Sequence, residues 1–235
     1  MPMNEIPPEA AVFARSAGGT SVMTVPGEPR WLFVQRDAQT ERWLPLPTGS
    51  VARSVLFIGD SITDGAAPAL TTMLSGWTAA FDAVVGRPSV GGVAPAAAAA
   101  ALRPTPDVVV VELGTNDADP AAFEANLRTI LTSLASVPLV LWQTVHSPQP
   151  AAADVNAAGR RLAERFPNVA IADWNAFVPP AAISSDGVHP LVGHEGLMAK
   201  LIAPLLSTWV QAVAGIGPAA CVPVSGVGRS GTPRP

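Results

Sequence analysis

The sequence predicts a three-layer α/β/α sandwich built on a mostly parallel, doubly wound sheet. Two observations support this fold class. Nearly continuous apolar runs of strand length recur along the middle of the chain, and helix-like segments separate them. Uninterrupted apolar runs are typical of strands that are covered on both faces of a parallel sheet. Regular alternation of such strands with helices favours the doubly wound arrangement.

Five apolar runs are expected to form the strands of this sheet. They are SVLFIG (54–59), WTAAFDAVV (77–85), DVVVVELG (107–114), PLVLWQTV (138–145) and NVAIAD (168–173). Helix-forming segments lie between and after them. These are expected at residues 68–75, 94–103, 120–136, 154–166 and 194–213. The order of the elements therefore repeats a strand followed by a helix.

The length and composition indicate one main domain. The chain has 235 residues, of which 49% are hydrophobic and 14% charged, so that a sizeable core can form. The alternating pattern assigns residues 51–214 to this domain. Residues 1–50 are expected to be an N-terminal extension with a short hairpin or extended β appendage. Residues 215–235 are rich in Gly, Pro and Ser and are expected to form a flexible tail.

Charge and cysteine content disfavour several classes of function. The formal net charge is −4 and the basic residues form no run, which disfavours nucleic acid as a partner. The single cysteine, Cys221, excludes an internal disulfide and a cysteine-based metal site. No signal peptide or membrane-spanning run is visible. The expected protein is soluble, cytoplasmic by default and secreted if a leader was removed.

Ser61 directly follows the first apolar run, in VLFIGDSITDG (55–65). In an open parallel sheet the ligand crevice lies beyond the carboxyl ends of the strands. Ser61 and Asn116, which lies in LGTND after the third run, are therefore expected to face one crevice. A Gly-Asp-Ser sequence after a strand is also typical of a turn with a helix cap. A nucleophilic role for Ser61 thus depends on partners elsewhere in the chain.

A base for Ser61 is found near the end of the domain. Imidazole is the usual base near neutral pH, and the histidines are His146, His189 and His194. His189 is the best candidate because Asp186 stands three residues earlier on a glycine-containing loop, where it can orient the ring. The sequence predicts a triad of Ser61, His189 and Asp186. His146 is expected in a loop-packing or surface role, with lining of the crevice as the alternative, and His194 on a helix surface.

Three hydrogen-bond donors are candidates for an oxyanion hole. The backbone N–H of Ser61 at a helix start can supply one, and the side-chain amide of Asn116 another. The N–H of Gly86, just beyond the second strand, is the expected third, with Gly91 and Gly92 as less favoured substitutes. Asn116 and Gly86 could instead serve only as turn formers.

Together these residues resemble the SGNH (GDSL-like) hydrolases. Four motifs carry the resemblance in the family's order: GDSITDG, VVGRPS, LGTND and DGVHP. The resemblance implies a flavodoxin-like α/β/α fold and an ester hydrolase that works without a metal or organic cofactor. It also assigns Ser61 as the nucleophile, Asp186 and His189 as its partners, and the Ser61, Gly86 and Asn116 donors to the oxyanion hole.

Two further phrases, DAVVGRP and NVAIADWNAF, are similar to SGNH domains associated with O-acetyl groups on polysaccharides or peptidoglycan. The expected activity is therefore hydrolysis of short-chain acyl esters, acetyl above all, with a small molecule or a carbohydrate as the alcohol part. Transfer of the acyl group to a sugar hydroxyl by the same residues is the alternative. A catalytically idle carbohydrate-binding module is a third hypothesis, which the intact Ser, His and Asp set disfavours.

Other polar and aromatic residues near the motifs have simpler interpretations. Asp60 is expected to hold its loop by hydrogen bonds rather than to take part in the reaction. The tryptophans are expected in the core or at its rim, and contact of Trp142 or Trp174 with a sugar or acyl group is the alternative.

Overall fold

A parallel five-stranded sheet forms the centre of the molecule. The structure, a computed structural model, describes residues 20–23, 31–37 and 40–214. The strand order is β5-β4-β6-β7-β8, and every neighbouring pair is parallel. The strands are β4 (Ser54–Gly59), β5 (Thr78–Ala83), β6 (Val108–Glu112), β7 (Leu139–Gln143) and β8 (Val169–Ala172). Because the first strand lies between the second and the third, the order reverses there, as in doubly wound folds.

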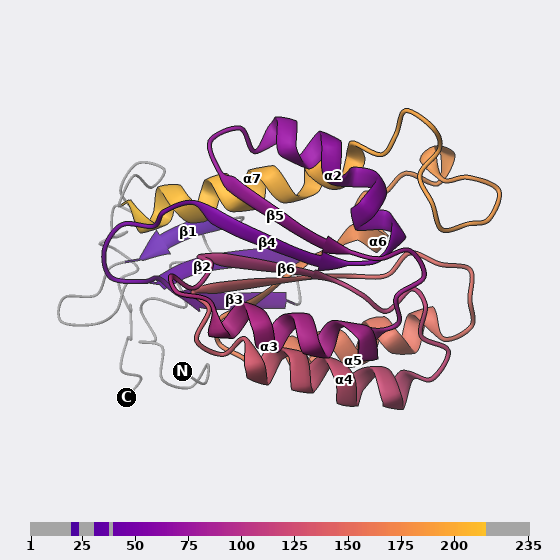
Figure 1. Ribbon diagram of the computed structural model, residues 1–235, viewed down its shortest axis with the longest axis horizontal. Helices are drawn as coiled ribbons and strands as arrows, with labels where there is room; N and C mark the ends of the chain where they lie inside the picture. The colour runs from indigo at the N-terminus through magenta and orange to yellow at the C-terminus, as the bar shows by residue number, and fades with distance from the viewer. Residues whose placement is uncertain (1–19, 24–30, 38–39, 215–235) are drawn as a thin grey trace, which may run out of the picture.

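Helices cover both faces of this sheet (Figure 1). The helix α2 (Ser61–Met73) and the C-terminal α7 (Leu197–Val213) lie on one face. The helices α3 (Val93–Ala101), α4 (Pro120–Ser133) and α5 (Ala152–Ala163) lie on the other. Short helical turns complete the connections: η2 (Ser89–Gly92), α6 (Trp174–Phe177) and η3 (Pro180–Ala182). The predicted three-layer α/β/α sandwich is confirmed.

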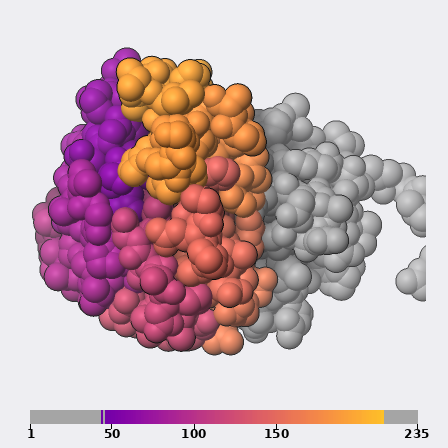
Figure 2. Space-filling model, turned by 90° about the vertical axis from the view of Figure 1, so that its right-hand side faces the viewer, coloured from indigo at the N-terminus to yellow at the C-terminus, as the bar shows by residue number. Residues whose placement is uncertain are grey.

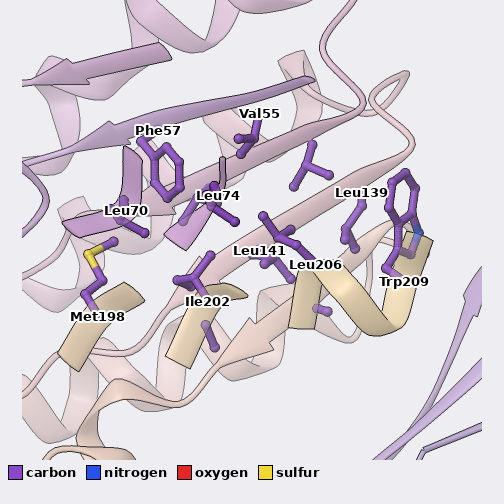
Figure 3. Close-up of a cluster of buried hydrophobic side chains, with 14 of the residues drawn as sticks. Val55, Phe57, Leu70, Leu74, Leu139, Leu141, Met198, Ile202, Leu206 and Trp209 are labelled. Atoms are coloured by element: carbon purple, nitrogen blue, oxygen red, sulfur yellow. The ribbon is translucent and has the colours of Figure 1, made fainter. Parts of the chain in front are cut away.

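The strands β4, β6, β7 and β8 are largely buried because their side chains alternate between two apolar layers. Figure 3 shows the layer under α2 and α7, where Phe57 and Leu141 from the strands meet Ile202 from α7. The second layer contains Trp142 and Phe123, whose rings lie 6.2 Å apart. Full burial of one such large side chain stabilises the fold by about 1.5–3 kcal/mol. The continuous apolar runs follow from this double coverage.

A second, three-stranded antiparallel sheet precedes the domain. It contains β1 (Thr20–Met23), β2 (Trp31–Asp37) and β3 (Thr40–Pro45) in that order. It falls in the stretch for which the sequence indicates a hairpin or an extended appendage. Leu44 and Leu46 at its end are buried in the apolar layer under α7. The predicted tail, 215–235, lies outside the described residues.

Two helix starts differ by three or more residues from the sequence-based expectation. The helix after the serine begins at Ser61 rather than Pro68, because the carboxylate of Asp60 caps it by accepting from the N–H of Ile62 at 3.0 Å. Pro68 therefore lies inside the helix. The last helix begins at Leu197 rather than at residue 194. In the described part of the chain, no helix is both long and apolar enough to cross a bilayer.

Candidate active site

The predicted site residues come from loops at the carboxyl ends of the strands. Ser61 follows β4, Gly86 follows β5, Asn116 follows β6, and the loop with Asp186 and His189 follows β8. These loops lie together at one end of the sheet, on the right in Figure 1. Figure 2 views that end directly, and the violet part of the chain that carries Ser61 adjoins the orange and yellow part after residue 180.

Ser61, His189 and Asp186 form a continuous chain of hydrogen bonds. Ser61 Oγ lies 2.8 Å from Nε2 of His189. Nδ1 of the same ring lies 2.7 Å from Oδ2 of Asp186. With the proton on Nδ1 donated to the carboxylate, Nε2 has a lone pair directed at the serine hydroxyl. The structure thus brings Ser61 together with His189 and Asp186, which lie more than 120 positions later in the sequence.

The loop around Asp186 holds its carboxylate in the ionised form. Its Oδ1 accepts from the hydroxyl of Ser184 at 2.7 Å and from the backbone N–H groups of Val188 at 2.8 Å and His189 at 3.0 Å. These bonds, the Ser184 hydroxyl first, followed by those to Val188 and His189, hold the pKa of Asp186 well below its usual range. A permanently charged acceptor beside Nδ1 stabilises an imidazolium when one forms.

The backbone N–H of Ser61 is the first of helix α2. First-turn N–H groups have no acceptor within their own helix. Asp60 takes the N–H of Ile62, and the buried Glu112 takes that of Thr63. For the Ser61 N–H the described residues offer no hydrogen-bond acceptor. A developing negative charge at this position also lies at the positive end of the helix dipole.

Asn116 is fixed by two hydrogen bonds from its amide nitrogen. Nδ2 donates to Oδ2 of Asp60 at 2.8 Å and to the backbone carbonyl of Arg87 at 3.2 Å. The shorter bond orients the amide beside Ser61. The longer bond occupies the second hydrogen of the amide with the carbonyl of Arg87. Asp60 thus orders the Asn116 side chain, and the Arg87 carbonyl would compete with any other acceptor for its amide hydrogen.

Gly86 lies in an exposed turn with a positive φ of 75°, and the described residues leave its N–H without an acceptor. An added Cβ there would meet nothing within 4 Å. The positive φ, rather than a lack of space, therefore explains why glycine occupies this position. Gly92, an alternative donor, is a packing glycine, because a Cβ would lie 2.3 Å from Leu113. Gly91 is similarly close to Arg87. Of the three glycines, Gly86 has the most open surroundings.

Side-chain networks brace the loop after β5 against the loop after β6. Asp117 accepts from the backbone N–H of Ser89 at 2.9 Å and from its hydroxyl, and Asn126 donates to that hydroxyl at 3.0 Å. Arg87 pairs with Asp82 and donates to the carbonyl of Gly59 at 3.3 Å. These hydrogen bonds could not be predicted from the sequence, because no local sequence pattern indicates which residues on different loops will pair.

A buried pair of carboxyl groups lies beneath the serine. Asp60 is fully buried and Glu112 nearly so. Burial raises the pKa of Glu112 well above its usual value, and the charge of Asp60 raises it further. Burial also raises the pKa of Asp60, while hydrogen bonds from Glu112 and Ile62 oppose the rise. The raised pKa favours the protonated form of Glu112. The sequence indicated a structural Asp60 but not its partner, whose only signal is an acidic residue ending a run of valines.

The remaining histidines and the tryptophans lie outside this chain of hydrogen bonds. His146 is half-buried after β7, with Nδ1 3.0 Å from Oδ1 of Asn175. His194 is exposed just before α7. Trp142 and Trp174 are buried, so the alternative in which they contact a sugar or acyl group is wrong.

Three solved structures have folds similar to that of this chain. The catalytic domain of the Streptococcus pneumoniae peptidoglycan O-acetyltransferase A is 26% identical, with a TM-score of 0.57 over 72% of this chain and 98% of that domain. A carbohydrate esterase of family 3 from Talaromyces cellulolyticus is 19% identical, with a TM-score of 0.57 over 67% and 98%. An acetyl esterase mutant with bound acetate is 19% identical, with a TM-score of 0.54 over 68% and 99%. The last two show the fold alone.

A search of the curated proteins gave no match. The family model of the GDSL-like lipases and acylhydrolases matches residues 57–192, which is more than half of the chain. This stretch contains all four sequence motifs, and the loops that carry them meet at one end of the sheet. Fold, motifs and match agree that the chain belongs to the GDSL-like lipase/acylhydrolase family, whose members are esterase-type enzymes.

Proposed function

We propose that this protein is a serine esterase that removes short acyl groups, acetyl above all, from hydroxyls of small molecules or carbohydrates. The observation that carries the proposal is the unbroken hydrogen-bond chain from Ser61 through His189 to Asp186. A non-catalytic carbohydrate-binding module would have no need of a base aligned on a serine hydroxyl.

Acylation begins when Nε2 of His189 takes the proton from Ser61 Oγ as this oxygen attacks the ester carbonyl. The 2.8 Å separation lies within the reach that general-base transfer needs. Asp186 stays ionised because its pKa is lowered by three donors besides the imidazole. It therefore stabilises the imidazolium and keeps the ring in the productive orientation.

The tetrahedral intermediate places its negative oxygen among three donors. They are the N–H groups of Ser61 and Gly86 and the amide of Asn116. As charge develops, the Asn116 hydrogen now shared with the carbonyl of Arg87 at 3.2 Å turns to the oxyanion. Its bond to Asp60 is kept and holds the amide in place.

Collapse of the intermediate breaks the ester bond, and His189 gives its proton to the leaving alcohol oxygen. The product is an acyl-Ser61 ester and a free alcohol. A water molecule then loses a proton to His189 and attacks the acyl carbonyl, which releases the carboxylic acid and restores the serine. Every proton in this cycle passes through Nε2.

The choice of acetyl and carbohydrate esters draws on the relatives. A peptidoglycan O-acetyltransferase is 26% identical to this chain, and the phrases DAVVGRP and NVAIADWNAF support the same substrate class. That relative also favours a second candidate function, O-acyl transfer. In this reaction a sugar hydroxyl replaces water as the acceptor in the second half of the cycle, and the same triad serves both.

The test is hydrolysis of p-nitrophenyl esters of increasing acyl length by the wild type and by Ser61→Ala. Turnover by the wild type should be greatest with acetyl and propionyl. Loss on substitution should reach about 10⁶-fold in kcat, because the triad acts as a unit. A folded Ser61→Ala protein that keeps its activity would refute the proposal. Product analysis with an O-acetylated sugar, with and without a second sugar as acceptor, distinguishes hydrolysis from transfer.

A further inference from the structure

Glu112 lies directly beneath the turn that carries Ser61. It is the last residue of β6, and Gly59, which ends β4, pairs with it across the sheet. Its Oε2 accepts three hydrogen bonds from this turn: from Asp60 N at 3.2 Å, Thr63 N at 3.3 Å and Thr63 Oγ1 at 3.0 Å. One side-chain oxygen therefore fixes the residues on both sides of the serine.

The turn has no room for a side chain between itself and Glu112. A Cβ on Gly59 would lie 2.1 Å from Thr63 Oγ1 and 3.1 Å from Glu112 Oε2. Thr63, like Asp60, is fully buried. The backbone at Gly59 thus packs tightly against both the carboxyl group and the hydroxyl. The height and tilt of the first turn of α2 depend on what occupies position 112.

The same carboxyl group accepts from the N–H of Asp60, and the charge of the Asp60 carboxylate raises its pKa. Asp60 in turn accepts from the amide of Asn116 and from the N–H of Ile62. The Asp60 carboxylate is thereby the link between Glu112 and a donor of the proposed oxyanion hole. When Glu112 is protonated, the negative charge of the pair lies on Asp60, whose Oδ2 accepts from the amide of Asn116.

We propose that Glu112 is a positioning residue that acts as a buried, neutral carboxylic acid, fixing the Ser61 turn and holding Asp60 as the ionised acceptor that orients Asn116. This inference rests on the proposed function for its kinetic readout, whereas the protonation of Glu112 is measurable without activity. Two neighbouring buried carboxyl groups repel each other strongly when both are ionised. Loss of the Glu112 proton would therefore destabilise this arrangement.

Few charged groups bear on the Glu112 proton. Asp60 faces it from the β4–α2 turn, and Asp117 and His189 act on Asp60 from the loops after β6 and β8. Arg87 reaches the carbonyl of the neighbouring Gly59. The chain contains no tyrosine, which removes one common source of alkaline titration. A decline of kcat at alkaline pH can therefore be traced by substitution at 112.

The experiment compares Glu112→Gln, Glu112→Ala and Thr63→Val. Gln keeps a neutral acceptor and donor, so this variant should keep most of the wild-type kcat at pH 7 and lose the decline that wild type shows as Glu112 ionises. Ala removes all three hydrogen bonds to the turn and should lower kcat by about 10²-fold, with little change in KM, as small misplacements of reacting groups do. In Thr63→Val the ionised form of Glu112 loses a hydrogen bond, so the decline should move to higher pH.

Infrared difference spectroscopy of wild type minus Glu112→Gln gives the readout that needs no catalysis. At neutral pH it should show the carbonyl band of one buried, protonated carboxyl group. If the wild type proves to have no esterase activity, the proposed function fails while this band still decides the state of Glu112. Absence of the band, equal kcat losses in the Gln and Ala variants, or an unchanged alkaline decline in Glu112→Gln would each overturn the inference. Should Glu112→Ala fail to fold, the Gln and Val variants still decide it.

Discussion

Pro148 lies against Gly187, so that the loop after β7 supports the loop that carries Asp186 and His189. Gly187 has a φ of 73°, and a Cβ there would lie 2.8 Å from Cγ of Pro148. The glycine is therefore required twice, once for its backbone conformation and once for this close approach. Gly187 lies between Asp186 and His189 in the sequence. A shift of its backbone would therefore move both of these residues.

Gly187→Ala should destabilise the fold and slow the reaction. The left-handed backbone alone costs about 1–2 kcal/mol with a Cβ, and the clash with Pro148 displaces His189 from Ser61. Chemical denaturation and kcat measure the two effects. Gly193→Ala is the matched control, since Gly193 also has a positive φ, 86°, but open space around it. If Gly193→Ala loses as much kcat as Gly187→Ala, the loss in Gly187→Ala is due to backbone strain alone. If the double variant Pro148→Ala/Gly187→Ala recovers part of the kcat, the loss is due to the clash with Pro148.

Asn116→Ala should reduce kcat by about 10²–10³-fold, because the oxyanion contact strengthens in the transition state. KM should change little, since the amide is engaged by Asp60 and the Arg87 carbonyl before the reaction. Steady-state kinetics with the acetyl ester give both values. Asn126→Ala, which removes a neighbouring amide bonded to Ser89, is the control. A raised KM at constant kcat would instead make Asn116 a ground-state binding residue.

The stability contributed by Asp186 should vanish in acid. The pKa of Asp186 is lowered in the folded protein, so the folded state binds fewer protons than the unfolded state between the two pKa values. The contribution is complete above the unfolded pKa and is lost as the pH falls through the folded one. The difference in free energy of unfolding between wild type and Asp186→Asn should accordingly be constant near neutrality and shrink below about pH 4. It should be small, because the side chain is half-exposed, and a difference that grows in acid would contradict the assignment.

His189→Ala should lose nearly as much kcat as Ser61→Ala, because no base then removes the serine proton. Asp186→Asn should lose less, at most about 10⁴-fold, since an amide can still contact the ring but favours the wrong tautomer. In the double variant the second substitution should be nearly silent if the two residues share one task. Additive penalties would mean separate tasks, and an active His189→Ala enzyme that depends on His146 or His194 would require a different base.

The sheet and the triad could be predicted because their signals are local or ordered along the chain. Runs such as VVVVE are apolar enough to require cover on both faces, and Asp186 and His189 stand three residues apart on one turn. The supports of the site could not be predicted in this way. The bonds of Glu112 to Thr63 and of Asn116 to Asp60 join residues more than 45 positions apart, and only the register of β4 beside β6 brings them together.

Trp142 and the start of α2 show a second limit of prediction from the sequence. At both places two interactions compete, and the sequence alone does not show which one prevails. Trp142 lies at the end of a strand, where either core or crevice was possible. The small Gly159 of α5 decides the matter, because a Cβ there would lie 2.1 Å from the indole ring and its absence leaves the ring a place inside. For α2, the Asp60 cap outweighs the interior Pro68, which by propensity would begin the helix.

The proposed base, His189, and its proposed orienting carboxylate, Asp186, belong to one short segment, whereas the proposed nucleophile, Ser61, comes from the other end of the domain. Hydrogen bonds among Ser184, Asp186, Val188 and His189 hold the 184–189 loop in shape from within. Ser61 reaches His189 only across 128 positions of sequence, through the completed sheet. A nascent or partly unfolded chain can therefore possess the dyad and the serine and still be inert toward esters. For the proposed esterase, turnover would require the whole domain to be folded, so an ester assay would also measure cooperative folding.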